Sequence, residues 1–219
     1  MGLNEMLSRE ESQQNRNIYG VAIGIVTNNS DPDGRGRVKV NLPWRGENDE
    51  SYWARIASPM AGNERGFVFY PEVGDEVLVA FERGDINYPY VIGALWNGQD
   101  KPPQTNADGK NNIRKIRSRS GHELIFNDDD KAKQEKIEIH TKGGHKIILD
   151  DSSGNEKIEI VDKSGNNKII IDSVQKSIAM ESAMKLTIKA NVVEIEGSTS
   201  LTLKSNAALT IQGMPVKIN

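Results

Sequence analysis

Three histidines, His122, His140 and His145, are the side chains of this sequence best suited to acid–base catalysis or metal binding. The chain contains no cysteine, which excludes a thiol nucleophile, a disulfide framework and a cysteine-based metal site. All three histidines fall within a repeated pattern of short strands, so we interpret them as surface or turn residues. The alternative is that three copies of one histidine meet on the axis of a trimer and hold an ion there.

The acidic and glycine-rich motifs favour turns over binding sites. Asp128, Asp129 and Asp130 follow a strand and precede a charged turn, which is typical of a solvated loop. The run Asp31-Pro32-Asp33-Gly34 starts like a calcium loop but lacks the later ligands and the bidentate glutamate. The glycines around Arg35 lack the following helix that a phosphate cradle needs. We therefore predict no catalytic residue, no cofactor, no metal site and no enzymatic activity.

The composition divides the chain into two parts. Eleven of the twelve aromatic residues lie before residue 97, and the stretch 97–112 is rich in Asn, Gly, Pro and Asp, as linkers are. Residues 1–118 carry 14 basic and 16 acidic residues, so they offer no electrostatic attraction to nucleic acid. We interpret most aromatics, including Trp44, Trp53, Phe67 and Phe81, as core or inter-subunit packing.

The first part reads as a series of short strands separated by turn signals, which predicts a small barrel or sandwich. The predicted strands are 21–26, 36–44, 52–57, 66–71, 75–82 and 90–96.

The second part is repetitive. Three copies of one unit occupy 120–129, 143–151 and 164–173, and the aligned residues Phe126, Leu149 and Ile171 are 23 and 22 residues apart. Between the copies lie the similar segments 135–142 and 156–163, so each unit contains two strands. After Met184 the pattern shortens to one strand and one turn, with steps of 7, 8, 8 and 7 residues between Ile188, Ile195, Leu203, Ile211 and Ile218.

These repeats cannot enclose their own apolar stripe. Alternation puts Leu186 and Ile188 on one face of a strand and Thr187 on the other. An eight-residue step is too short for a coil of two or three strands within one chain, so we expect three chains to wind together around an axis. A shared core also explains an apolar content of only 36%. The other interpretation is a set of ordinary amphipathic strands in a monomeric sheet. The residues expected to point to the axis are Ile147, Leu149, Ile169, Ile171, Leu186, Ile188, Leu201, Leu203, Leu209 and Ile211.

Three stretches of sequence, 36–44, 51–103 and 117–128, resemble the spike proteins of contractile injection systems, which include phage baseplate assembly protein V and the VgrG spike of type VI secretion. The resemblance covers about residues 18–219. It implies an all-β homotrimer, with an N-terminal OB-fold barrel followed by an intertwined triple-stranded β-helix needle. We therefore predict an N-terminal arm (1–17), an OB-fold domain (18–98), a linker (99–118) and a triple-stranded β-helix spike (119–219).

The resemblance also implies partners and a place of action. They are a hub protein at the N-terminal end, a PAAR-type cap at the tip, and baseplate and tube components. The tip residues expected to contact a cap are Met214, Pro215, Val216 and Ile218, and the end of the chain lacks the His-x-His motif by which some phage spikes bind iron. Such a spike assembles in the cytoplasm into a virion or a phage tail-like particle and meets the target membrane only during injection.

The sequence shows no targeting segment, and two other functions remain as alternatives. There is no apolar stretch of about 18 residues and the first 19 residues are polar, so we expect neither a transmembrane helix nor a secretory signal peptide. The alternatives to a structural spike are a β-helical, polysaccharide-degrading tailspike and an OB-fold nucleic-acid-binding protein.

Overall fold

The computed structural model describes residues 17–46 and 49–218, so the predicted arm lies outside the described residues except for Asn17. The chain forms two compact units, Met1–Thr105 and Asn106–Asn219, which divide within the predicted linker. The described residues form fourteen strands and a single 3-10 turn, which confirms the all-β prediction. None of their helical segments has the length and apolarity needed to cross a bilayer.

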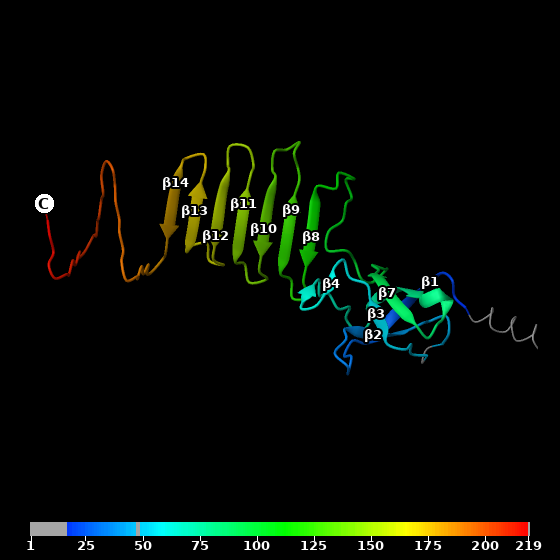
Figure 1. Ribbon diagram of the computed structural model, residues 1–219. Coiled ribbons are helices and arrows are strands. Elements are labelled where there is room, and N and C mark those ends of the chain that lie inside the picture. The colour runs from blue at the N-terminus through cyan, green and yellow to red at the C-terminus, as the bar shows by residue number, and fades with distance from the viewer. Residues whose placement is uncertain (1–16, 47–48, 219) are drawn as a thin grey trace, which may run out of the picture. The chain divides into compact units, whose positions relative to one another are not determined.

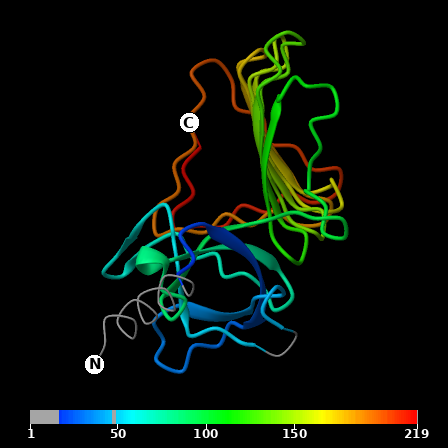
Figure 2. The same cartoon turned by 90° about the vertical axis from the view of Figure 1, so that its right-hand side faces the viewer.

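The first unit is built around a closed five-stranded barrel (Figures 1 and 2). The strands follow one another around it in the order β1, β2, β3, β7, β6, and β6 pairs with β1 to close it. All neighbours are antiparallel except β3 and β7, which are parallel. This confirms the predicted N-terminal barrel. The elements of this unit are β1 (Val21–Asn28), β2 (Arg37–Asn41), β3 (Ala54–Ile56), β4 (Ala61–Gly62), β5 (Arg65–Gly66), β6 (Glu76–Phe81), η1 (Glu82–Gly84) and β7 (Pro89–Ala94).

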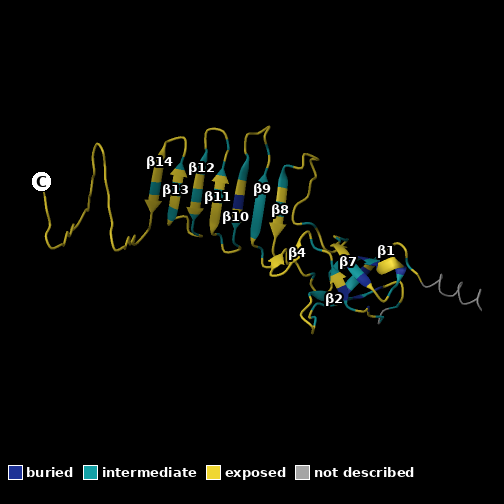
Figure 3. Cartoon of the chain, viewed as in Figure 1, coloured by how far each residue is buried: buried dark blue, intermediate teal, exposed yellow. Residues whose placement is uncertain are grey.

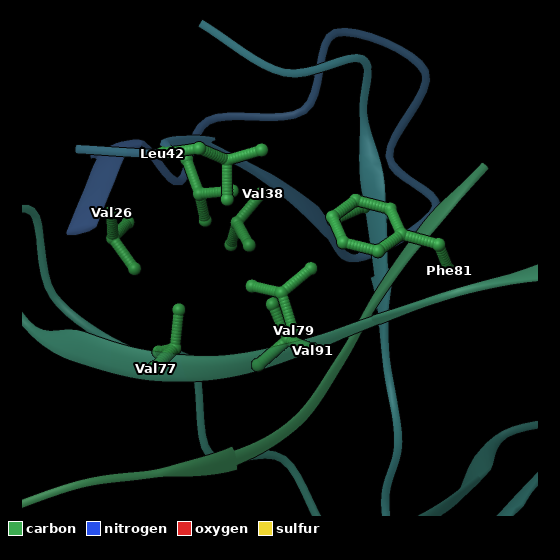
Figure 4. Close-up of a cluster of buried hydrophobic side chains, with 9 residues drawn as sticks. Val26, Val38, Leu42, Val77, Val79, Phe81 and Val91 are labelled. Atoms are coloured by element: carbon green, nitrogen blue, oxygen red, sulfur yellow. The ribbon is translucent and has the colours of Figure 1, made fainter. Parts of the chain in front are cut away.

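Aliphatic side chains fill the barrel, because alternate residues of each strand point inward (Figure 4). Gly24 in β1 shows how tight the packing is, since a Cβ there would lie 3.1 Å from Val79 Cγ2 and 3.3 Å from Val40 Cβ. The buried core residues are Val26, Val38, Val40, Leu42, Ala54, Val77, Val79, Phe81 and Val91.

The aromatic residues depart from the expected core. Phe81 is buried, whereas Trp44 and Phe67 are exposed on the single chain. The predicted strand 66–71 is wrong apart from Gly66, because residues 67–70 join no sheet of the described chain. These four residues are all apolar, so they lack the alternation of apolar and polar residues that is typical of a half-buried strand.

The second unit contains a seven-stranded antiparallel sheet in which each strand pairs with the next one along the chain (Figure 1). Figure 2 views the sheet with its strands one behind another. The first strand, β8, falls inside the stretch assigned to the linker, and the two-strand repeat units account for the others. The strands are β8 (Ile113–Arg117), β9 (Glu123–Asn127), β10 (Lys136–His140), β11 (Lys146–Asp150), β12 (Lys157–Val161), β13 (Lys168–Asp172) and β14 (Ser177–Glu181).

The remaining residues, 182–218, are extended but belong to no strand of the described chain. Bends interrupt them at Asn191, at 198–199, at 206–207 and at 214–215, so the bends recur at the predicted step of about eight residues. We call residues 185–218 the tail. The short strands predicted here do not pair within one chain, and the triple-stranded β-helix stays a prediction.

Candidate assembly interface

One face of the seven-stranded sheet carries two unbroken rows of mostly apolar side chains. The pairing register puts directly opposite residues on the same face, and each strand contributes a residue to each row. One row runs from β8 to β14 as Ile116, Leu124, Ile139, Ile147, Ile160, Ile169 and Met180. The other runs as Arg114, Phe126, Ile137, Leu149, Ile158, Ile171 and Ile178.

The opposite face carries most of the charges of the sheet, and several of them form ion pairs. Lys115 Nζ lies 3.3 Å from Glu123 Oε1, Lys157 Nζ lies 3.0 Å from Glu159 Oε1, and Lys168 Nζ lies 3.2 Å from Glu181 Oε2. The aliphatic stem of a lysine can lie along apolar surface while its ammonium group stays beside a carboxylate. The isoleucines of the central row, Ile125, Ile148 and Ile170, are partly buried.

Glu138 in β10 is the most buried residue of this charged face. Its side chain pairs with Lys136, and its Oε2 lies 2.6 Å from His140 Nε2. Glu138 is only 8% exposed, whereas Ile137 and Ile139 on either side of it are exposed. Figure 3 shows the buried band that results within the exposed and half-buried strands of the sheet. A buried carboxylate between exposed isoleucines reverses the usual distribution.

The sheet is therefore covered on its polar face and uncovered on its apolar face. A contiguous apolar surface of this extent marks an interaction site, because its exposure to water is unfavourable. Ile147, Leu149, Ile169 and Ile171, which were expected to point to an axis, all lie on this face. The remaining expected axis residues, Leu186, Ile188, Leu201, Leu203, Leu209 and Ile211, lie in the tail and are exposed.

Sequence reasoning found only part of the apolar face. It singled out the strands β11 and β13, but β9, β10, β12 and β14 contribute equivalent residues. The signal was present, because the segments between the repeat copies have the same apolar spacing of two residues. The residues missed in this way are Leu124, Phe126, Ile137, Ile139, Ile158, Ile160, Ile178 and Met180.

The histidines serve the turns and the charged face. His122 Nδ1 accepts a hydrogen bond from Lys142 N at 3.3 Å, and His145 Nδ1 accepts one from Lys163 N at 3.2 Å. In the third repeat copy Asn167 stands in place of histidine, and its Oδ1 accepts from Ala183 N at 3.2 Å. One side chain per copy thus links its turn to the next turn at the same end of the sheet.

His140 lies on the charged face beside Glu138. None of the three histidines lies in either apolar row of the sheet. The described residues contain no group of three or more His, Asp or Glu side chains that could hold a metal ion.

The acidic motifs form turns, as predicted. Asp31 lies at the turn between β1 and β2, where it accepts hydrogen bonds from Arg37 Nε and Arg37 Nη2, each at 2.8 Å. Its side chain is only 3% exposed. The guanidinium of Arg37, helped by backbone N–H donors of residues 33, 35 and 37, holds the pKa of Asp31 well below its usual range.

Two other turns are stabilised in the same manner. Asp162, between β12 and β13, accepts from Asn167 Nδ2 and from Ser164 Oγ, both at 2.8 Å. These hydrogen bonds lower the pKa of Asp162 to about 2. Asp129 Oδ1 accepts from Ala132 N at 3.1 Å, which supports the interpretation of 128–130 as a turn.

The barrel surface carries exposed aromatic side chains. Trp53 is partly covered by two cations, since Arg37 Cζ lies 5.8 Å and Lys39 Nζ lies 5.5 Å from its ring centroid. Other aromatic rings of this unit are uncovered and available for contact with another surface. They are Tyr19, Trp44, Tyr52, Phe67, Phe69, Tyr70, Tyr88 and Trp96.

Comparison with known proteins finds a described domain that the barrel resembles. The family model for the type VI secretion system/phage-baseplate injector OB domain matches residues 22–96. The model therefore covers nearly the whole barrel, from the second residue of β1 to just beyond β7.

Several longer proteins are similar over a larger part of the chain. The actin cross-linking toxin VgrG1 of Vibrio cholerae is 30% identical over 149 residues, which are 61% of this chain and 13% of that protein. The type VI secretion system spike protein VgrG4b of Pseudomonas aeruginosa is 36% identical over 130 residues, which are 50% of this chain and 16% of that protein. VgrG2a of the same organism is 38% identical over 79 residues, which are 34% of this chain and 9% of that protein. The chain thus spans a small part of each relative's length.

Proposed function

We propose that this chain is a VgrG-like, non-enzymatic homotrimeric spike at the tip of a contractile tail or injection-system tube, because its barrel matches the injector OB domain and VgrG spike proteins are among its relatives. Three sheets pack their apolar faces together around a common axis, and the three tails continue as an intertwined, triple-stranded β-helix. The spike helps to pierce the target envelope when the tube is driven forward.

The observation that carries this proposal is the reversed burial of the seven-stranded sheet. Its polar face is covered by its own ion pairs, and Glu138 is buried there, whereas both apolar rows are open. The rows cross all seven strands with Arg114 as their one charged member, so they fit a long axial core better than a pocket for a small ligand. Each chain supplies one such face, and a closed arrangement of three faces removes all of them from water.

The tail supports the same assembly. Its backbone is extended, and no backbone–backbone hydrogen bond joins residues 182–218 to one another in the described chain. Unpaired N–H and C=O groups of extended segments need partners once they are buried. Neighbouring chains supply these partners in an intertwined helix.

The proposal also assigns one partner to the barrel and another to the last described residues of the tail. The barrel end anchors the spike to the baseplate through a hub protein, and its exposed aromatic rings are suited to such contacts. At the other end Met214 is fully exposed, Ile218 is exposed and Val216 is half-exposed, so this tip with Pro215 presents an apolar end for a PAAR-type cap.

Light scattering on the purified full chain tests the proposal. We expect a mass three times the 24.2 kDa of one chain at micromolar concentration. A monomer under these conditions contradicts the proposal. Glycan-degrading activity would favour the tailspike alternative, and salt-dependent binding of single-stranded DNA would favour the OB-fold nucleic-acid binder.

A further inference from the structure

We propose that the free edge of β14 binds the first tail segment, Lys185–Lys189, of a neighbouring protomer. Pairing between strands of different protomers thus begins directly after β14, whereas β8–β14 pair only within their own chain. This inference rests on the proposed trimer and specifies where its protomers exchange strands.

The outer edge of β14 is unpaired in the single chain. In the described chain β14 pairs only with β13, and the sheet ends there. Ile178 of β14 is 69% exposed, whereas Ile171 and Ile158 in the same row are 41% and 42% exposed. Ile178 is more exposed because no further strand packs beside β14 on its outer edge. An unpaired edge presents N–H and C=O groups that bind a further strand.

The tail of the same chain is directed away from this edge. Directly after β14, Ala183 N donates to Asn167 Oδ1 at 3.2 Å, and Ser182 Oγ lies 3.0 Å from the same atom. Asn167 precedes β13, so these contacts hold the chain on the inner side of β14. Leu186 then borders a trough of about 620 Å³ together with residues of one apolar row, including Ile147 and Ile169.

The connection to the tail is also short. Connections between the strands of this sheet contain four to eight residues, but only three residues, 182–184, separate β14 from Lys185. The same chain could reach its own edge only through a tighter reversal than any in the sheet. The bends of the tail contain no hydrogen-bonded turn such as those that close the hairpins.

The segment Lys185–Lys189 matches the edge that it would cover. It has five residues, as does every strand of this sheet. Leu186 and Ile188 continue the two apolar rows, and Thr187 falls on the outer face. With the central residues opposite each other, Glu181 faces Lys185 in an antiparallel pair and Lys189 in a parallel pair, so an ammonium group lies beside this carboxylate in either direction.

Engineered disulfides test the inference against a background without cysteines. Ala179 and Thr187 are the central, outward-facing residues of the two segments, so they lie opposite each other in either direction. The double variant A179C/T187C is made in the full chain and oxidised. A non-reducing denaturing gel shows which chains are covalently linked, and light scattering gives the mass of the particle. The matched control is A179C/T202C, because Thr202 occupies the same central position two tail segments further along.

We expect A179C/T187C to yield a covalent trimer that reduction converts to monomers, and A179C/T202C to yield none. A disulfide within one chain, or free thiols, in a particle whose mass is that of a trimer would overturn the inference and leave the trimer standing. A monomeric mass for the unmodified chain would instead refute the proposed function. The reduced double variant must melt at the temperature of the unmodified protein, which excludes misfolding as the cause of a negative result.

Discussion

Two neighbouring isoleucines in β11 provide the sharpest test of which face of the sheet is buried by assembly. Ile147 lies in an apolar row between Ile139 and Ile160. Ile148 lies on the opposite face, between Glu138 and Glu159. The substitutions I147K and I148K add the same charge to the same strand, one residue apart, so a difference between them reports the face alone.

The expected difference is large. Ile147 keeps 38% of its surface exposed in the single chain. Covering that remainder contributes roughly 0.6–1 kcal/mol per protomer, if full burial of an isoleucine is worth about 1.5–3 kcal/mol. A lysine there loses this contribution and places an unpaired ammonium in the interface, which costs several kcal/mol per ion. Over three protomers the loss is on the order of 10 kcal/mol, or about 10⁷-fold in the association constant.

The control is expected to keep its assembly. The ammonium of I148K lies between two carboxylates, which offset the loss of a partly buried apolar side chain, so we expect a change of about 1 kcal/mol or less. Light scattering gives the mass of each variant, and a thermal melt in detergent gives its resistance. A trimeric I147K with an unchanged melt, or equal disruption by I148K, would refute the assignment of the apolar face to the interface.

The other predictions concern the tail, the turn links and the barrel. I188D buries three carboxylates near one axis, so we expect loss of the trimer or of its heat and detergent resistance; an unchanged melting curve would show that Ile188 does not point inward. H145N should keep the link between turns because Asn167 already provides it in the third copy, whereas H145L should lose about 1 kcal/mol, and hydrogen exchange at the following turn distinguishes them. D31N should destabilise the barrel more than D33N does. Because the folded pKa of Asp31 lies below its ordinary 3.8, this difference should be complete above that pH and disappear as the pH falls toward the folded value in denaturation experiments.

The repeat pattern predicted the architecture of the second unit well. A unit of about 22 residues with two apolar, alternating segments contains enough chain for two five-residue strands and two turns, and the structure has them. Glycine-containing turns such as those around Gly144 and Gly165, both with positive φ, close the hairpins at one end of the sheet. Local signals of this kind are readable because the hairpins pair residues that are close in sequence.

The sequence did not predict the strand β8, because this strand lacks the apolar alternation of the other six. Its sequence, 113–117, carries three basic residues, and one of them, Arg114, occupies the end of an apolar row. Its position is set by pairing with β9 and by the ion pair between Arg114 and Asp128. Neither is visible as apolar alternation.

The barrel shows where composition misleads. Apart from Phe81 and Leu42, its core is made of short aliphatic residues, because valine fits the narrow interior of a five-stranded barrel. Aromatic residues such as Trp44 and Tyr52 lie outside the core and are exposed. The sequence shows that aromatics cluster in the first unit. Whether each side chain points into or out of the barrel depends on how strands that are distant in sequence pair to close it.

The two kinds of repeat have different requirements for stability. In β8–β14 each strand finds its backbone partners within its own chain, so the sheet satisfies its hydrogen bonds before any association and needs other chains only to cover its apolar rows. In the tail, the described chain offers the segments no backbone partners, so under the proposed assembly both their hydrogen bonds and their apolar burial come from neighbouring chains. Under the proposed assembly the sheet therefore aligns three chains first. The tails then order from β14 toward the tip, because each exchanged segment creates the edge that the next one binds.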